Sequence, residues 1–280
     1  MSEWISDVVG PGVAQSTQID EMLYDRRSAY QRIQIARSEV FGGMLILDDA
    51  VQTTERDEFI YHEMLVHPAL LTHRQPKRML IIGGGDGGAL REALKHPLET
   101  VTMVDIDGEV IAASRRYLPG ISAGAFEDPR ARVLLEDGIA FVRTTDERFD
   151  CIAVDSTDPK GPGLALFADE FFAACARVLT DEGVLAVQSG SLLYQQSLGA
   201  QVARALGARF PVVARFWAAV PSYPGVLWGF TCASRRTDPR SVTPETIANR
   251  MSGIATRFYS PATHHAALVF PALPVFDRDR

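Results

Sequence analysis

The sequence is poor in cysteine, has no long apolar run and carries no surplus of basic residues. Its three cysteines, Cys151, Cys175 and Cys232, are widely spaced and lie among apolar neighbours. An odd number at this spacing predicts neither a disulfide framework nor a zinc cluster, so we expect buried thiols in a reducing compartment. No apolar run approaches the roughly 18 residues that span a membrane, and the N-terminus MSEWISDVVG carries acids where a signal peptide needs bases. These shortages predict a cytoplasmic protein with no membrane segment.

The charge balance argues against polyanionic partners. Lys and Arg total 28 against 35 Asp and Glu, which leaves a net charge of -7 at pH 7. A chain of this charge is not expected to bind nucleic acid or an acidic membrane, and cationic small molecules match it better. Mild acidity is also ordinary among cytosolic proteins, so charge by itself identifies no ligand.

The hydrophobic pattern changes near residue 58. Before it, YQRIQIARSEVF alternates in part, two glycines follow, and then MLIL, which together predict a β-hairpin within a small β domain over residues 1–57. From Met79 onward the short apolar runs MLII, VTMV, CIAV and VLAV each precede a helix-like stretch. This alternation is typical of a mostly parallel sheet with crossover helices. We therefore expect an α/β fold with a larger catalytic domain over residues 58–280.

A glycine-rich turn, IIGGGDGGALRE, follows the first of these apolar runs. Gly83, Gly85 and Gly88 match the GxGxxG pattern, which fits dinucleotide and adenosyl ligands about equally well. Asp86 lies inside the turn, where its carboxylate would repel the pyrophosphate of a dinucleotide. It would also favour decarboxylated S-adenosylmethionine, which ends in an ammonium alone, over the carboxylated form. The alternative is that Asp86 only caps the following helix.

Two further acidic residues follow later strands of the predicted sheet. Asp105 comes nineteen positions after Asp86, near the spacing at which nucleotide-binding folds receive ribose hydroxyls. Asp107 is predicted to cap the next helix. Asp137 and Gly138 follow another short strand and are candidates for the adenine amino edge, although an Asp-Gly pair is also an ordinary turn.

The segment FDCIAVDSTDPKGPGLALF carries a second pair of carboxylates. Asp155 ends a buried strand, and Asp158 follows in a loop stiffened by prolines, so both are predicted at the ligand edge of the sheet. An alkylamine is protonated at pH 7 and must lose a proton before it can attack. Asp155 is the candidate proton acceptor, unless both residues serve only as turn and cap.

With these segments in view, the chain resembles the spermidine synthase family of polyamine aminopropyltransferases. The resemblance covers nearly the whole chain, through YQ, LDDAVQTTERDEFIYHEML, GGGDGG, VDID, EDG, DSTDPKGP, PSYPG and FYSPATHHAA. It implies a Rossmann-like, class I methyltransferase-type α/β fold with a small N-terminal β domain. It also implies transfer of the aminopropyl group of decarboxylated S-adenosylmethionine to a diamine, putrescine first, with cadaverine and agmatine as alternatives. No metal or cofactor is implied, and a homodimer or homotetramer is expected.

The resemblance also implies a role for individual residues. The methylthioadenosine part would be held by Gln31, Asp105, Asp137, Gly138 and Pro162. The aminopropyl group and the acceptor amine would be surrounded by Tyr61, His62, Asp86, Asp155, Asp158 and Tyr223. Within this second set, Tyr61 and His62 would orient the reacting amine and Asp155 would accept its proton. His264 matches a histidine of the family but is expected to be structural.

The chain departs from the usual family pattern at three positions. Family members usually have Glu at the position of Asp105, Gly at that of Asp49 and Glu at that of Leu164. The first keeps the hydrogen-bonding chemistry with a shorter side chain. The loss of a carboxylate at Leu164 predicts a looser distal end of the acceptor site.

Two other functions remain as alternatives. An S-adenosylmethionine-dependent amine N-methyltransferase has the same fold, but relatives that methylate putrescine lack the loop aspartate present here as Asp86. A non-catalytic protein that binds an adenosyl ligand or NAD would not need Asp155 and Asp158. Turnover with the decarboxylated donor separates the three.

Overall fold

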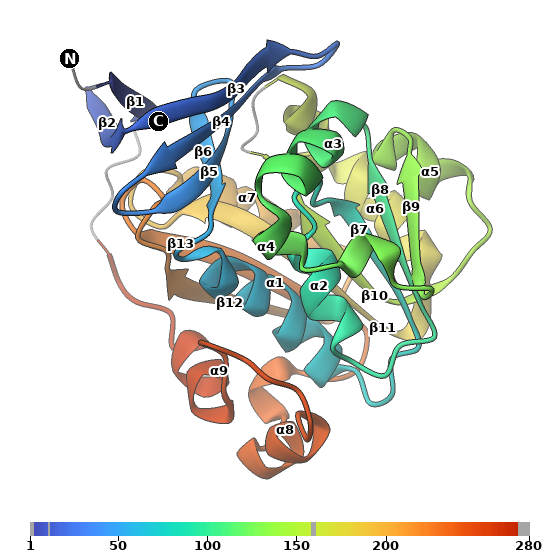
Figure 1. Ribbon diagram of the computed structural model, residues 1–280. Helices are drawn as coiled ribbons and strands as arrows, with labels where there is room; N and C mark the ends of the chain where they lie inside the picture. The colour runs from blue at the N-terminus through green and yellow to red at the C-terminus, as the bar shows by residue number, and fades with distance from the viewer. Residues whose placement is uncertain (1–2, 11, 158–160, 274–280) are drawn as a thin grey trace.

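A seven-stranded sheet forms the centre of the molecule (Figure 1). The computed structural model describes residues 3–10, 12–157 and 161–273. The strand order is β9-β8-β7-β10-β11-β13-β12, with β7 to β11 parallel and β13 antiparallel to both of its neighbours. The strands are β7 (Arg78–Gly83), β8 (Thr100–Asp105), β9 (Ala131–Leu135), β10 (Phe149–Asp155), β11 (Leu179–Ser191), β12 (Val212–Ala219) and β13 (Leu227–Ser234).

The central strands are rich in apolar residues because helices cover both faces of the sheet. In β7, Met79 and Ile81 belong to one core cluster while Leu80 and Ile82 belong to the other. The first face is covered by α1 (Glu58–Thr72), α2 (Gly88–Leu94), α8 (Pro244–Arg250) and α9 (Pro261–Ala267). The second is covered by α5 (Gly138–Thr144), α6 (Asp169–Val178) and α7 (Gln196–Gly207). The remaining helices are α3 (Gly108–Tyr117), α4 (Pro119–Ser122) and the short 3-10 turns η1 (Ala125–Glu127), η2 (Gly161–Phe167) and η3 (Pro239–Ser241).

An antiparallel N-terminal β domain packs beside the glycine-rich end of this sheet (Figure 1). Its sheet contains β3 (Glu21–Arg27), β4 (Arg32–Ser38), β5 (Gly42–Leu47) and β6 (Ala50–Thr54), and a separate hairpin is formed by β1 (Glu3–Gly10) and β2 (Val13–Ile19). Apolar side chains of β4 and β5 pack on α3 and α4, while the hairpin packs on the other face of the four-stranded sheet. One domain therefore rests on the helices that follow β8.

The predicted α/β fold with its N-terminal β domain is confirmed, and so is the hairpin, which is β4 and β5. The turn is placed slightly differently, since Gly42 and Gly43 begin β5 and residues 39–41 precede it. The sequence patterns did not reveal the β1-β2 hairpin or the antiparallel pair β12 and β13. All three cysteines are buried and free, as expected. Within the described ranges, no helix is both long and apolar enough to cross a membrane.

Candidate active site

The site lies where the strand order of the sheet reverses. From β7 the chain moves outward through β8 and β9, and it then returns to the other side of β7 as β10, which leaves a crevice at the carboxyl ends of β7 and β10. Gly83 and Asp155 end these strands as register partners. The Gly84 N–H donates to the Asp155 carbonyl oxygen at 2.9 Å, and a Cβ on Gly83 would collide with that oxygen. Glycine is required there because the two backbones lie too close for a Cβ and because Gly83 has a φ of 84°.

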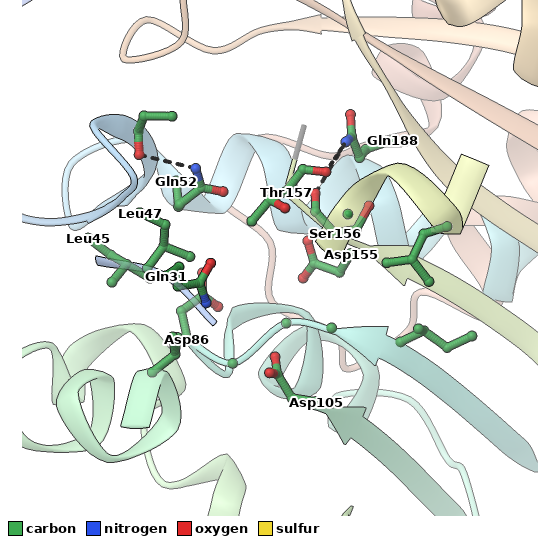
Figure 2. Close-up of a pocket in the computed structure, with 18 of the residues that line it drawn as sticks. Gln31, Leu45, Leu47, Gln52, Asp86, Asp105, Asp155, Ser156, Thr157 and Gln188 are labelled. Carbon is green, nitrogen blue, oxygen red and sulfur yellow. Dashed lines mark hydrogen bonds between the residues drawn. The ribbon is translucent and has the colours of Figure 1, made fainter. Parts of the chain in front are cut away.

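The pocket has one wall from each domain. Figure 2 shows Gln31, Leu45 and Leu47 on the side of the N-terminal β domain, facing Asp105 and the glycine-rich loop. Asp155, Ser156 and Thr157 line the side formed by β10, and Gln188 of β11 donates to the carbonyl oxygens of Ser156 and Thr157 at 3.2 and 3.4 Å (Figure 2). The pocket is also lined by Asp7, Gln52, Tyr61, Asp86, Asp137, Gly138, Tyr223 and Trp228.

Asp155 presents one carboxylate oxygen with a fixed partner and one without. The Tyr61 hydroxyl donates to Oδ1 at 2.8 Å, while Oδ2 is buried and has no hydrogen-bond partner among the described residues. Burial, reinforced by the nearby charge of Asp86 and opposed by His62, raises the pKa of Asp155 to about 6. Burial likewise raises the pKa of Tyr61 well above its usual range, so this phenol stays a donor. A carboxylate that titrates near neutral pH and has an open oxygen is suited to accept a proton.

Asp86 lies in the loop between β7 and α2, two residues before the helix begins, and on the pocket wall. Its Oδ1 accepts the Gly88 N–H at 2.7 Å and lies 3.4 Å from His62 Nε2. Burial would raise the pKa of Asp86, but the positive charge of His62 and the Gly88 N–H outweigh it and lower that pKa below its ordinary value. The N-cap of α2 is Gly87 and carries no side-chain cap, so Asp86 is not the helix cap, although it accepts the N–H of the first helical residue. Its ionised carboxylate lines the pocket.

His62 occupies a different place from the one predicted. The pocket is lined by Tyr61 but not by His62, because successive helical residues project about 100° apart and the His62 side chain turns toward Gly88 and α2. Its Nδ1 lies 2.7 Å from Glu58 Oε2. The prediction that His62 contacts the reacting amine is corrected accordingly, since this ring contacts Asp86 from behind the pocket wall.

The same pocket carries groups predicted to hold adenosine. Asp105 ends β8, accepts the Asp107 N–H through Oδ1 at 2.8 Å, and has its pKa raised to about 6 by burial. Asp137 is the N-cap of α5 and accepts the Ile139 N–H at 2.8 Å. It also lines the pocket, so the same residue both caps the helix and forms part of the wall. Gly138 also lines the pocket. Asp107 caps α3, as the sequence predicted.

Aromatic rings close the side of the pocket near Asp155. The Tyr223 and Trp228 rings meet edge to face at 4.7 Å between centroids, and Tyr61 lies 5.6 Å from Tyr223. The Tyr223 hydroxyl donates to the Gln52 carbonyl oxygen at 2.5 Å, which connects this wall to β6. The two rings come from the loop and strand that follow β12, so the antiparallel edge of the sheet contributes to the site.

The charge of the pocket wall is of one sign. Five aspartates line it, and no Lys, Arg or His does so among the described residues. These aspartates are Asp7, Asp86, Asp105, Asp137 and Asp155. A wall of this composition attracts cations and repels phosphate and carboxylate groups.

The structure brings together most of the predicted site. Eight of the predicted residues line one pocket: Gln31, Tyr61, Asp86, Asp105, Asp137, Gly138, Asp155 and Tyr223. Asp158 lies outside the described residues, as does the side chain of Pro162. His264 is buried and hydrogen-bonded to Tyr259 and Pro239, which is consistent with a structural role.

Sequence reasoning missed Asp7 and overvalued Leu164. Asp7 comes from β1, is buried, accepts the Val51 N–H at 3.0 Å and lines the pocket. No local motif marks it, because only the packing of the β1-β2 hairpin brings it there. Leu164 is 61% exposed and is not part of the pocket wall, so the predicted loosening of the acceptor site by this residue is not supported. Asp49 has a φ of 67°, which explains why family members place Gly at this turn.

Comparison with known proteins agrees over the whole chain. The family model described as the spermine/spermidine synthase domain matches residues 58–242, and the one described as the spermidine synthase tetramerisation domain matches residues 3–55. The chain is 41% identical to a polyamine aminopropyltransferase of Desulforudis audaxviator, over 100% of this chain and 99% of the relative. It is 43% identical to one from a Ruegeria species, over 96% and 95%.

Solved structures give the same result. The fold superposes on a spermidine synthase in complex with the transition-state analogue AdoDATO with a TM-score of 0.92, at 36% identity and with 96% and 92% of the two chains covered. It superposes on the spermidine synthase of Thermotoga maritima with a TM-score of 0.89, at 34% identity and with 96% and 91% covered.

Proposed function

Because this chain belongs to the spermine/spermidine synthase family, we propose that it transfers the aminopropyl group of decarboxylated S-adenosylmethionine to putrescine, giving spermidine and methylthioadenosine. Both substrates are cations. A solved relative carries a transition-state analogue of its reaction, which supports the same class of chemistry here.

The observation that carries the proposal is that every charged side chain on the described pocket wall is an aspartate. The donor bears a sulfonium and an ammonium, and the acceptor bears two amines that are protonated in water. Five carboxylates with no neighbouring cation on the described wall match these charges. A dinucleotide would instead place its pyrophosphate beside Asp86, and S-adenosylmethionine would place its carboxylate there, so both are disfavoured by repulsion.

The reaction proceeds by proton removal followed by displacement. The acceptor ammonium gives a proton to Oδ2 of Asp155, which is the oxygen that Tyr61 leaves free. The neutral nitrogen then attacks the aminopropyl carbon next to sulfur, a C–N bond forms, and the C–S bond breaks with its electron pair going to sulfur. The positive charge moves from the sulfonium to the new secondary amine. The leaving group is an uncharged thioether, so alignment of the two substrates supplies most of the rate enhancement.

The remaining residues position the substrates. Asp86 holds the donor ammonium, while Gln31, Asp105, Asp137, Gly138 and Pro162 hold the methylthioadenosine part. The far amine of putrescine is received by Asp7, and the rings of Tyr223 and Trp228 enclose the methylene chain. Asp158, which lies outside the described residues, is proposed from the sequence to help hold this cationic acceptor. His62 acts through Asp86.

The N-terminal β domain supports a homo-oligomer, either a dimer or a tetramer. Residues 3–55 match the domain described as mediating tetramerisation, and β1 carries the exposed Trp4 and Val8. Light scattering of the purified protein distinguishes a monomer, a dimer and a tetramer.

The deciding experiment is to incubate the purified protein with decarboxylated S-adenosylmethionine and putrescine and to measure methylthioadenosine and spermidine. We expect the two products in equal amounts. Methylation of putrescine by S-adenosylmethionine would identify an N-methyltransferase instead, and donor binding without either product would identify a non-catalytic adenosyl-binding protein.

A further inference from the structure

A buried chain of oppositely charged side chains extends from Asp86 into the interface of α1 and α2. Asp86 Oδ1 lies 3.4 Å from His62 Nε2, and His62 Nδ1 lies 2.7 Å from Glu58 Oε2. The two carboxylate oxygens of Glu58 accept from Arg91 at 2.9 and 2.8 Å, which is a bidentate pair. Of these four residues only Asp86 lines the pocket. The other three form a support behind it.

The His62 ring is also confined by the backbone of α2. A Cβ on Gly88 would overlap the ring, so the imidazole packs directly on the first residue of α2. The side chains of His62 and Glu58 are 2% and 5% exposed, and that of Arg91 is 15% exposed. Solvent therefore screens these contacts little, and the ring has one orientation that satisfies both of its nitrogens.

We propose that Glu58 and Arg91 are positioning residues for the reaction: they hold the His62 ring against Gly88 and, through it, fix the Asp86 carboxylate on the pocket wall where the donor ammonium binds. This inference rests on the proposed function, because that function supplies the donor ammonium that Asp86 binds. Neither Glu58 nor Arg91 touches the pocket, so their effect on the donor passes entirely through His62 and Asp86.

Negative and positive side chains alternate from the pocket wall inward: an aspartate, a histidine, a glutamate and an arginine. Burial would lower the pKa of His62, but Asp86 and Glu58 raise it well above its ordinary range, so the ring is a cation at neutral pH. The groups that face this ring are Glu58 on its own helix, Asp86 in the β7-α2 loop and, farther off, Asp155 at the end of β10. Asp86 stays ionised while Asp155, in the same pocket, has its pKa raised to about 6. The contacts behind the pocket wall thus keep Asp86 ionised for binding the donor ammonium, while Asp155 titrates near neutral pH and can take up a proton.

Helix α1 offers a matched control for a purely structural role. Glu63 is fully buried on the same helix and accepts the backbone N–H groups of Arg257, Phe258 and Tyr259 at 2.7 to 2.8 Å. It has no contact with Asp86 or His62 among the hydrogen bonds and ion pairs of the described residues. Glu63→Gln therefore removes the same charge from the same helix at similar burial, but on the side that faces the C-terminal segment.

The test is a double-mutant cycle on the donor's KM. In the protein with Asp86 intact, Glu58→Gln is expected to raise the KM for decarboxylated S-adenosylmethionine about tenfold or more and to lower kcat less. In an Asp86→Asn background the same substitution is expected to change this KM by less than about twofold, because the group through which it acts is gone. Glu63→Gln is expected to lower the unfolding temperature without changing the KM for the donor.

Equal effects of Glu58→Gln in both backgrounds would overturn the proposal, as would an effect no larger than that of Glu63→Gln. A second measurement does not depend on turnover: NMR titration of the His62 imidazole. We expect a cationic ring at pH 7.5 in the unmodified protein and in Glu63→Gln, and a large neutral fraction in Glu58→Gln. If the protein transfers no aminopropyl group, the proposed function fails while this titration still decides whether Glu58 holds His62 charged. A His62 ring that is neutral in the unmodified protein, or unaffected by Glu58→Gln, refutes the support itself.

Discussion

Replacing Asp155 with Asn should stabilise the folded protein and nearly abolish its activity. Folding buries this carboxylate in the pocket and raises its pKa from 3.8 to about 6. A difference of about two pH units corresponds to ~3 kcal/mol at neutral pH, and because part of the side chain faces the open pocket we expect about 1 to 3 kcal/mol. Asn keeps an oxygen that can accept from the Tyr61 hydroxyl, so the substitution removes the buried charge and retains the hydrogen bond.

The pH dependence of this gain follows from the direction of the pKa change. The folded protein holds the Asp155 proton more tightly than the unfolded chain does, so ionising it costs stability as the pH rises from about 4 to about 6. The full cost is present above pH 6 and absent below about pH 4. The stability difference between Asp155→Asn and the unmodified protein should therefore be near zero at pH 4 and reach its maximum above pH 6. A gain of 3 kcal/mol in a chain of this length corresponds to an increase of roughly 5 °C in the unfolding temperature.

Two measurements check this prediction. Thermal unfolding of both proteins is followed from pH 4 to 8 at one fixed protein concentration, because oligomerisation also shifts the transition. The pH profile of kcat/KM is recorded in parallel. The unmodified enzyme should lose activity below about pH 6, where Asp155 is protonated. Above about pH 6, Asp155→Asn should be slower by a factor on the order of 100 to 10,000, and this difference should narrow as the pH falls.

Asp105→Asn is the matched control. Burial also raises the pKa of Asp105 to about 6, so this variant should gain stability over the same pH range. It should raise the KM for the donor but keep the acidic limb of kcat/KM, since Asp105 is proposed to hold the adenosine part of the donor and not to accept the proton. An Asp155→Asn protein that is no more stable at pH 7 than at pH 4 would refute the buried-charge argument. Retention of the acidic limb in that variant would show that another group accepts the proton.

Three further predictions concern the pocket and its loop. Asp86→Asn should raise the KM for decarboxylated S-adenosylmethionine and weaken discrimination against S-adenosylmethionine by a few kcal/mol, and unchanged donor preference in competition binding would contradict its role. Val226→Gly should increase the free energy of unfolding by about 1 kcal/mol, because this β-branched residue has a φ of 64°. Gly225→Ala should destabilise instead, since its φ is 78° and its Cβ would lie 2.8 Å from the Tyr194 ring; an equal loss in both variants would rule out strain at Val226. Putrescine should have a higher kcat/KM than cadaverine, agmatine or spermidine, with roughly 1 to 3 kcal/mol for the added methylene, and a clear preference for spermidine would mean a longer pocket and a spermine synthase.

The catalytic end of the site follows from the sequence because it depends on local order along the chain. Short apolar runs that alternate with helices predict a parallel sheet, and parallel strands bring their carboxyl ends to one edge. Asp86, Asp105, Asp137 and Asp155 each follow such a run, so they had to lie near one another once the sheet formed. The glycines of the turn after β7 mark the same edge, because only glycine permits the contact between Gly83 and the Asp155 backbone.

The tertiary structure decided the features that depend on segments distant in the chain or on the direction of a side chain. Asp7 reaches the pocket only because the β1-β2 hairpin packs on the N-terminal sheet, and this placement leaves no local pattern. Tyr61 and His62 are neighbours in the sequence, yet one faces the pocket and the other faces α2, because the helical rotation between them puts the pocket wall between their side chains. The direction of the side chain also decides the place of Leu164, which projects into solvent although it lies near the catalytic motif in the sequence. Sequence order determines which chemical groups gather at the edge of the sheet, whereas helix rotation and domain packing determine which of them face the ligand.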